Sequence, residues 1–145
     1  MTTVRQLLDR KDRAVFSVGP EAPVLEAIRA MAEHHVGALL VMKGEVLAGI
    51  VSERDYARKV ILQGRSSKET PVSEIMSSPV VTVSPQHTVG QCMHIVTDKR
   101  IRHLPVVEDG AVLGMISIGD LVNWVMLEQE RTIRHLEAYI SGSLS

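Results

Sequence analysis

Aromatic side chains, cysteine and long hydrophobic runs are scarce in this sequence of 145 residues. Aromatic residues make up 3% of the chain, too few for a surface that stacks the bases of single-stranded nucleic acid. Cys92 is the only cysteine, so no disulfide can form within the chain. The start "MTTVRQLLDRKD" lacks a signal-peptide core, and no apolar run approaches the roughly 20 residues that cross a bilayer. We therefore expect a cytoplasmic protein that neither spans nor contacts a membrane.

An excess of charge of one sign is also missing. The net charge is −1, with 45% hydrophobic and 23% charged residues, which is typical of a folded domain. Lys99, Arg100, Arg102 and His103 form one basic cluster, but it is too short for a nucleic-acid surface and fits a phosphate pocket or a solvated edge better. We therefore expect no nucleic-acid partner.

The sequence does contain an internal repeat. A shift of 65 residues places "GIVSERDY" (49–56) on "GMISIGDL" (114–121) with no gap, and Gly, Ser and Asp coincide. The same shift aligns further identical or similar apolar residues on both sides of this stretch. The chain is therefore predicted to be a tandem duplication, with repeats at 1–64 and 65–145.

Each repeat shows the same order of patterns. A short β-prone run ends at a Gly-Pro or Ser-Pro pair, and apolar residues then recur at helical spacing, as at Val24, Ile28 and Met31. Two apolar runs separated by a turn follow, and a helix at 53–63 or at 118–140 ends the repeat. The pattern predicts an α/β fold built from two β-α-β-β-α units.

Three segments lie outside this scheme. "VRQLL" (4–8) resembles "VSEIM" (72–76) if the first repeat carries a short insertion around "KDR", so each repeat is expected to begin with an amphipathic lead-in. The polar segment 64–79 is expected to link the repeats. The last helix carries an extra apolar stripe, which this chain or a second one must cover: Ile133, Leu136 and Ile140.

A Ser-x-x-Asp pair opens the final helix of each repeat, as Ser52 and Asp55 and as Ser117 and Asp120. One interpretation is a reciprocal helix cap, worth about 1 kcal/mol. The other is a binding motif, because a helix N-terminus suits phosphate and a short carboxylate can accept two hydrogen bonds from a ribose diol. The occurrence of the pair twice in matching contexts favours a pocket for an adenosine-like ligand.

With these features the sequence resembles a CBS-domain pair, or Bateman module, of the stand-alone bacterial type. "HLPVVEDG" and the two Gly-Ser-Asp stretches carry the resemblance over nearly the whole chain. It implies two repeats packed about a pseudo-two-fold axis with two clefts between them, and a disc-shaped homodimer. It also implies a regulatory protein, not an enzyme, that binds an adenine nucleotide without a metal and signals to an unknown partner. AMP or NAD(H) is favoured, and ADP, ATP or S-adenosylmethionine is possible.

The resemblance also assigns residues to each cleft. The first cleft would use Ser52, Arg54, Asp55, Met76, Pro79, Val81, Ile101, Arg102 and His103. The second would use Phe16, Val36, Gly37, Ala38, Ser117, Gly119 and Asp120, and Arg102 and His103 could reach it too.

The two clefts differ in charge. Gly119 stands in the second repeat where Arg54 stands in the first, and glycine cannot grip phosphate as a guanidinium can. The "KDR" insertion alters the opening of the Asp120 cleft. We therefore expect the Asp55 cleft to be the better site for a phosphate-bearing ligand.

Other functions fit the sequence less well. His87, Cys92 and His94 do not have the spacing of a tetrahedral metal site, and Cys92 falls on the predicted inner face of a helix. No Walker loop, G-x-S-x-G elbow or H-E-x-x-H motif is present. The alternative is a ligand-free homo-oligomeric interaction module with vestigial clefts.

Overall fold

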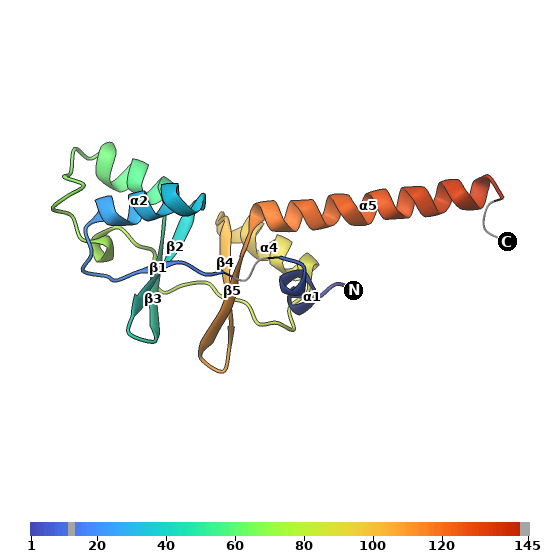
Figure 1. Ribbon diagram of the computed structural model, residues 1–145, viewed down its shortest axis with the longest axis horizontal. Helices are drawn as coiled ribbons and strands as arrows, with labels where there is room; N and C mark the ends of the chain where they lie inside the picture. The colour runs from blue at the N-terminus through green and yellow to red at the C-terminus, as the bar shows by residue number, and fades with distance from the viewer. Residues whose placement is uncertain (12–13, 143–145) are drawn as a thin grey trace.

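The computed structural model describes residues 1–11 and 14–142. Two small α/β halves lie side by side, and one long helix, α5 (Ile118–Ile140), projects from the body (Figure 1). The mixed α/β architecture predicted from the repeat is confirmed. Within the described residues, no helix combines the length and the apolar composition needed to span a bilayer.

The first half contains a three-stranded sheet in the order β1-β2-β3, with β1 parallel to β2 and β2 antiparallel to β3. Its helix α2 runs along the sheet, and α3 continues directly into the π-helix η1. The bounds are β1 (Ser17–Val18), α2 (Val24–His34), β2 (Ala38–Lys43), β3 (Val46–Ser52), α3 (Glu53–Tyr56) and η1 (Ala57–Ile61).

The second half repeats the helix and the hairpin but loses the first strand. Its elements are α4 (Val89–Lys99), β4 (His103–Glu108) and β5 (Ala111–Ser117), followed by α5. We expected the β-prone run at 79–83, before Ser84-Pro85, to form a strand. This prediction is wrong, because only a single parallel bridge joins Val83 to Val106. In the first half the backbone N–H of Leu40 donates to the carbonyl of Phe16 and so pairs β2 with β1. In the second half Pro105 stands at the position of Leu40 and has no N–H to donate.

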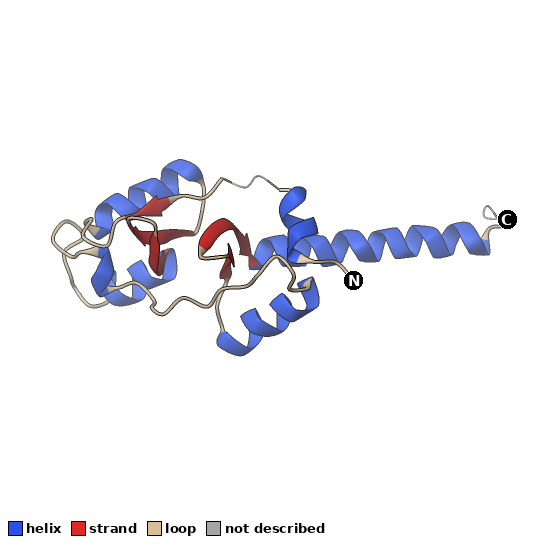
Figure 2. Ribbon diagram, turned by 90° about the horizontal axis from the view of Figure 1, so that it is seen from below, coloured by secondary structure: helices blue, strands red, loops and turns tan. Residues whose placement is uncertain are grey.

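The two lead-in segments are exchanged between the halves. Helix α1 (Val4–Asp9) comes first in the sequence but lies in the half that carries α4 and α5 (Figure 2). The 3₁₀ turn η2 (Val72–Glu74), in the segment expected to be a linker, packs into the first half. The buried residues that α1 gives to the second core are Val4, Leu7 and Leu8, and those that the η2 region gives to the first core are Val72 and Ile75.

Two glycines make room for this exchange. A Cβ atom on Gly49 would lie 2.5 Å from the sulfur of Met76, and one on Gly114 would lie 3.0 Å from Cδ2 of Leu8. The first distance is shorter than Cβ contacts in proteins, and the second is tight, so glycine makes room where each exchanged segment crosses a hairpin. Leu8 and Met76 therefore occupy equivalent places in the two halves.

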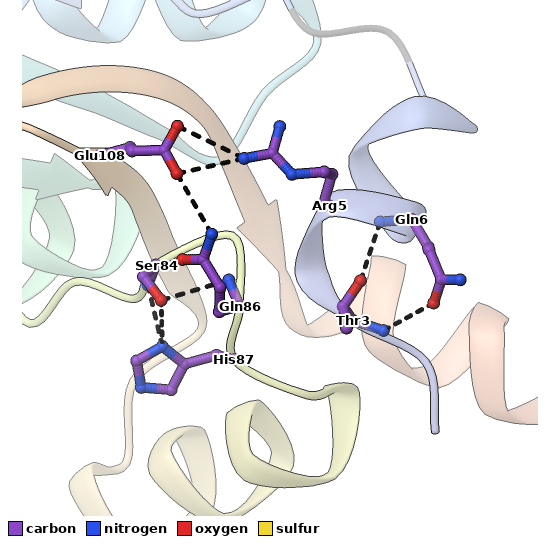
Figure 3. A network of polar contacts seen from close by, with 7 residues as sticks. All are labelled: Thr3, Arg5, Gln6, Ser84, Gln86, His87 and Glu108. Atoms are coloured by element: carbon purple, nitrogen blue, oxygen red, sulfur yellow. Dashed lines mark hydrogen bonds and ion pairs between the residues drawn. The ribbon is translucent and has the colours of Figure 1, made fainter.

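Polar contacts also hold α1 against the second half (Figure 3). Arg5 forms an ion pair of 3.1 Å with Glu108, which in turn accepts a hydrogen bond from Gln86. Nearby, Nδ1 of His87 accepts a hydrogen bond from the backbone N–H of Ser84. His87 therefore shapes the turn before α4.

Candidate functional site

A cleft of about 520 Å³ lies between the two halves. Its walls come from the start of α3, from η1, from the segment after η2 and from the start of β4. Eight of the nine residues expected in the first cleft line it together: Ser52, Arg54, Asp55, Pro79, Val81, Ile101, Arg102 and His103. The ninth, Met76, packs on Gly49 and the first core and does not line the cleft.

Sequence reasoning missed several lining residues. Gly37 was assigned to the second cleft but lines the first, where a Cβ atom on it would lie 3.7 Å from the ring of His103. Arg58 and Lys59 follow Arg54 and Asp55 by four residues, a helical spacing that could have identified them. The other lining residues not assigned in advance are Ile50, Glu53, Ser77, Val80 and Arg100.

The Ser-x-x-Asp pair in this cleft forms the helix cap that one interpretation predicted. Oδ2 of Asp55 accepts hydrogen bonds from the backbone N–H of Ser52 at 2.9 Å and from its hydroxyl at 3.0 Å. The N–H of Asp55 donates to the Ser52 hydroxyl in return. The other carboxylate oxygen, Oδ1, faces Lys59 at 3.2 Å. The cap thus fixes a carboxylate at the cleft wall with one oxygen turned away from the backbone.

Positive charge dominates the lining of the cleft. Five cationic side chains face two carboxylates, those of Glu53 and Asp55. The π-helix η1 carries two of the cations, and π turns often mark functional sites. The cations come from both halves of the chain: Arg54, Arg58, Lys59, Arg100 and Arg102. Such a lining produces a positive potential that favours anionic groups.

His103 lies between the two Ser-x-x-Asp pairs. Burial lowers the pKa of its imidazole, and Arg102 and Lys11 lower the pKa further, while the charge of Asp120 acts in the opposite direction. The side chain is therefore neutral at pH 7. A neutral imidazole leaves the positive charge of the cleft to the arginines and Lys59.

The second Ser-x-x-Asp pair forms the same cap, but a lysine from a distant segment binds its carboxylate. The N–H of Ser117 donates to Oδ2 of Asp120 at 2.8 Å. Lys11, the one described residue of the "KDR" insertion, places its Nζ 2.6 Å from the same oxygen and donates to the carbonyl of Met115 at 2.7 Å. Burial raises the pKa of Asp120, but the hydrogen bonds from Lys11 and Ser117 outweigh burial, and the pKa lies below its ordinary value.

The remaining residues expected in the second cleft are dispersed. Phe16 stacks on His34 with ring centroids 3.8 Å apart, and Val36 packs on the first core. Ala38 is buried, and Gly119 lies beside the Ser117 hydroxyl at the start of α5. Together with the place of Gly37 in the first cleft, this leaves the two expected clefts unequal.

Comparisons with known proteins agree with this architecture. A family model described as the CBS domain matches the chain twice, over residues 4–61 and 72–127. The mitochondrial CBS domain-containing protein CBSX3 of Arabidopsis thaliana is 49% identical over 124 residues, which are 82% of this chain and 60% of that protein. The CBS domain-containing protein YhcV of Bacillus subtilis is 34% identical over 113 residues, which are 78% of this chain and 80% of YhcV.

Solved structures share the fold. A protein with CBS domains from Burkholderia ambifaria MC40-6 is 50% identical, with a TM-score of 0.86 over 88% of this chain and 96% of the other. The CBS domain pair of protein MJ0100, solved with 5-methylthioadenosine and S-adenosylmethionine, has a TM-score of 0.79 at 22% identity over 88% and 98% of the two chains. CBS domains typically serve as regulatory modules. The chain belongs to the CBS domain family, and its two repeats form a CBS-domain pair.

Proposed function

We propose that this chain is a sensor that binds a phosphate-bearing adenosine ligand in the Asp55 cleft and signals to a partner protein. The observation that carries the proposal is the set of five cationic side chains beside the capped carboxylate of Asp55. The volume of about 520 Å³ falls within the range of about 300–1,000 Å³ that is usual for small-molecule sites. AMP and NAD(H) are the first candidates, followed by ADP and ATP.

Each part of the ligand has a matching part of the cleft. Oδ1 of Asp55, which faces Lys59 and not the backbone, accepts from the ribose hydroxyls, and the guanidinium groups of Arg54 and Arg102 bind phosphate. Val81 and Ile101 provide apolar surface for the base. No metal ion is needed, because the cations of the chain supply the charge that phosphate requires.

The proposed ligand joins the two halves of the chain. Arg54 and Asp55 belong to the first half, whereas Arg102 belongs to the second. A ligand that contacts both stabilises one arrangement of the halves, and this change is the signal that a partner reads. A cytoplasmic location is part of the proposal, since the only cysteine, Cys92, is buried and unpaired.

A thermal-shift screen of the purified protein tests the proposal. A ligand at 100 times its dissociation constant adds about 2.7 kcal/mol to the free energy of unfolding, which raises the melting temperature. We expect AMP, NAD and ATP to raise it, and adenosine and S-adenosylmethionine to raise it less, because neither brings a phosphate to the arginines. An equal response to adenosine and AMP would contradict the role of the cations.

The apolar stripe on α5 favours a second candidate, a homo-oligomeric interaction module. Ile133, Leu136 and Ile140 are 53%, 53% and 83% exposed and recur at intervals of three and four residues. Such spacing suits a helix seam between two copies, and we propose that the chain is a homodimer through α5. Light scattering of Leu136→Glu should show monomers where the unmodified protein shows dimers. Dimers with no nucleotide response would favour the ligand-free module.

A further inference from the structure

We infer that Lys11 is a built-in occupant of the Asp120 cleft, which takes the place of a ribose and limits each chain to one bound nucleotide. The inference rests on the proposed function, because it concerns a cleft of the same kind. Lys11 reaches Asp120 from a segment more than 100 positions away in the sequence. It also binds the carbonyl of Met115, on the strand that leads to the same helix.

Lys11 places its ammonium group on one oxygen of the carboxylate that a ribose would need. Oδ2 of Asp120 already accepts the N–H of Ser117, and Lys11 approaches the same oxygen at 2.6 Å. A ribose diol needs acceptor oxygens directed into the cleft, and an ammonium group held by two acceptors competes with it for them. The ion pair is only partly exposed, with 29% of the Lys11 side chain and 28% of the Asp120 side chain accessible. It is therefore screened less by solvent than a surface pair.

The lysine at the Asp55 cleft acts differently. Lys59 lies four residues after Asp55, is 46% exposed and forms part of the cleft wall. Its second acceptor is the carbonyl of Ile75, in the exchanged η2 segment. Lys59 thus contacts Asp55 at the edge of a cleft that stays open, whereas Lys11 joins Met115 to Asp120 across the start of α5.

The position of Lys11 follows from the insertion. Leu8 and Met76 are structural equivalents because each lies against the glycine of a hairpin. Five residues separate Leu8 from Ala14, but only two separate Met76 from Pro79 at the matching place in the repeat. Lys11 lies within this longer connection, so the second repeat has no lysine at the corresponding place in the chain.

Nuclear magnetic resonance tests the inference with adenosine and AMP as probes. The amides of Arg54 and Asp55 report on the first cleft, and those of Gly119 and Asp120 report on the second. Lys11→Met removes the charge and keeps a chain of similar length. Lys68→Met, an exposed lysine outside both clefts, is the matched control.

We expect AMP to shift only the Asp55 signals in the unmodified protein and in Lys68→Met. In Lys11→Met, adenosine should shift the Gly119 and Asp120 signals as well, and the number of ligands per chain should rise from one to two. The pKa of Asp120 should rise in that variant because the ion pair is lost, and well-dispersed amide signals show separately that the variant is folded.

Two results would overturn the inference. Ligand-dependent shifts at Gly119 and Asp120 in the unmodified protein would show that Lys11 does not close the cleft. The absence of such shifts in folded Lys11→Met would show that Lys11 is not what closes it. Failure of the proposed function has a separate signature, namely no shift at Arg54 and Asp55 with AMP in any form of the protein.

Discussion

The Asp55 cleft and the Asp120 cleft come from one duplicated motif and have diverged in chemistry. Both begin with a serine that caps a helix and an aspartate that caps it in return. Arginines surround Asp55, and a cavity lies beside it. At Asp120, Gly119 stands in place of Arg54, and Lys11 forms an ion pair with the carboxylate. The comparison teaches that the cap preserves the local backbone, while the flanking side chains set the capacity for a ligand.

A pair of substitutions that makes the first cleft resemble the second has the largest expected effect. Arg54→Gln with Arg102→Gln removes two charge-assisted contacts to phosphate, each worth about 1.5 kcal/mol or more. AMP affinity should fall about 100-fold, measured by calorimetry, while adenosine affinity stays nearly constant. Arg131→Gln, on the projecting part of α5, is the control and should change neither. A parallel loss for both ligands would mean that the arginines do not contact phosphate.

The hairpin glycines allow a second comparison of the two halves. Gly49→Ala would place Cβ 2.5 Å from the Met76 sulfur and 3.0 Å from the Ser77 carbonyl, so we expect a loss of about 1–3 kcal/mol in the free energy of unfolding. Gly114→Ala meets only the tip of Leu8 at 3.0 Å and should cost less. Urea unfolding measures both. Equal losses at the two glycines would contradict the packing of the exchanged segments.

The smallest expected effect concerns His103, which connects the two clefts. Its pKa is lowered by burial, so the unfolded chain takes up a proton near pH 6.5 before the folded chain does. The contribution of neutral His103 to the free energy of unfolding is therefore fully present above about pH 6.5 and is lost as the pH drops below that value. Denaturant titrations from pH 8 to pH 5.5 should show a shallower fall for His103→Gln than for the unmodified protein. Identical slopes would mean that the folded protein does not lower the pKa of His103.

Much of the fold could be predicted because the duplication repeats its own signals. The gapless 65-residue shift predicted both hairpins and both helices that follow them, and the first of these helices is followed by Gly64, which has a positive φ of 66°. The absence of a strand at 79–83 could be predicted only by asking which residue of β4 would pair with that segment. Pro105 was visible in the sequence, but its effect depends on its pairing with the segment before α4.

The exchange of lead-in segments could not be predicted from pattern alone. Val4, Leu7 and Leu8 are amphipathic, which shows that they are buried but not against which half. The same limit applied to Lys11, because a lone lysine in an insertion has no sequence signal for a partner as distant as Asp120. For the Asp55 cleft, by contrast, the family resemblance placed eight of the nine expected residues at the cleft, and helical spacing could have added Arg58 and Lys59.

Calorimetric titration of AMP into Asp55→Ala and Asp120→Ala tests the account most directly. Each substitution removes an equivalent helix cap and an ion pair with a lysine, so each serves as the control for the other. The account predicts that the unmodified protein binds one AMP per chain, that Asp120→Ala leaves this affinity unchanged, and that Asp55→Ala weakens it at least 10-fold. Unchanged binding in Asp55→Ala, or loss of binding in Asp120→Ala, would contradict it.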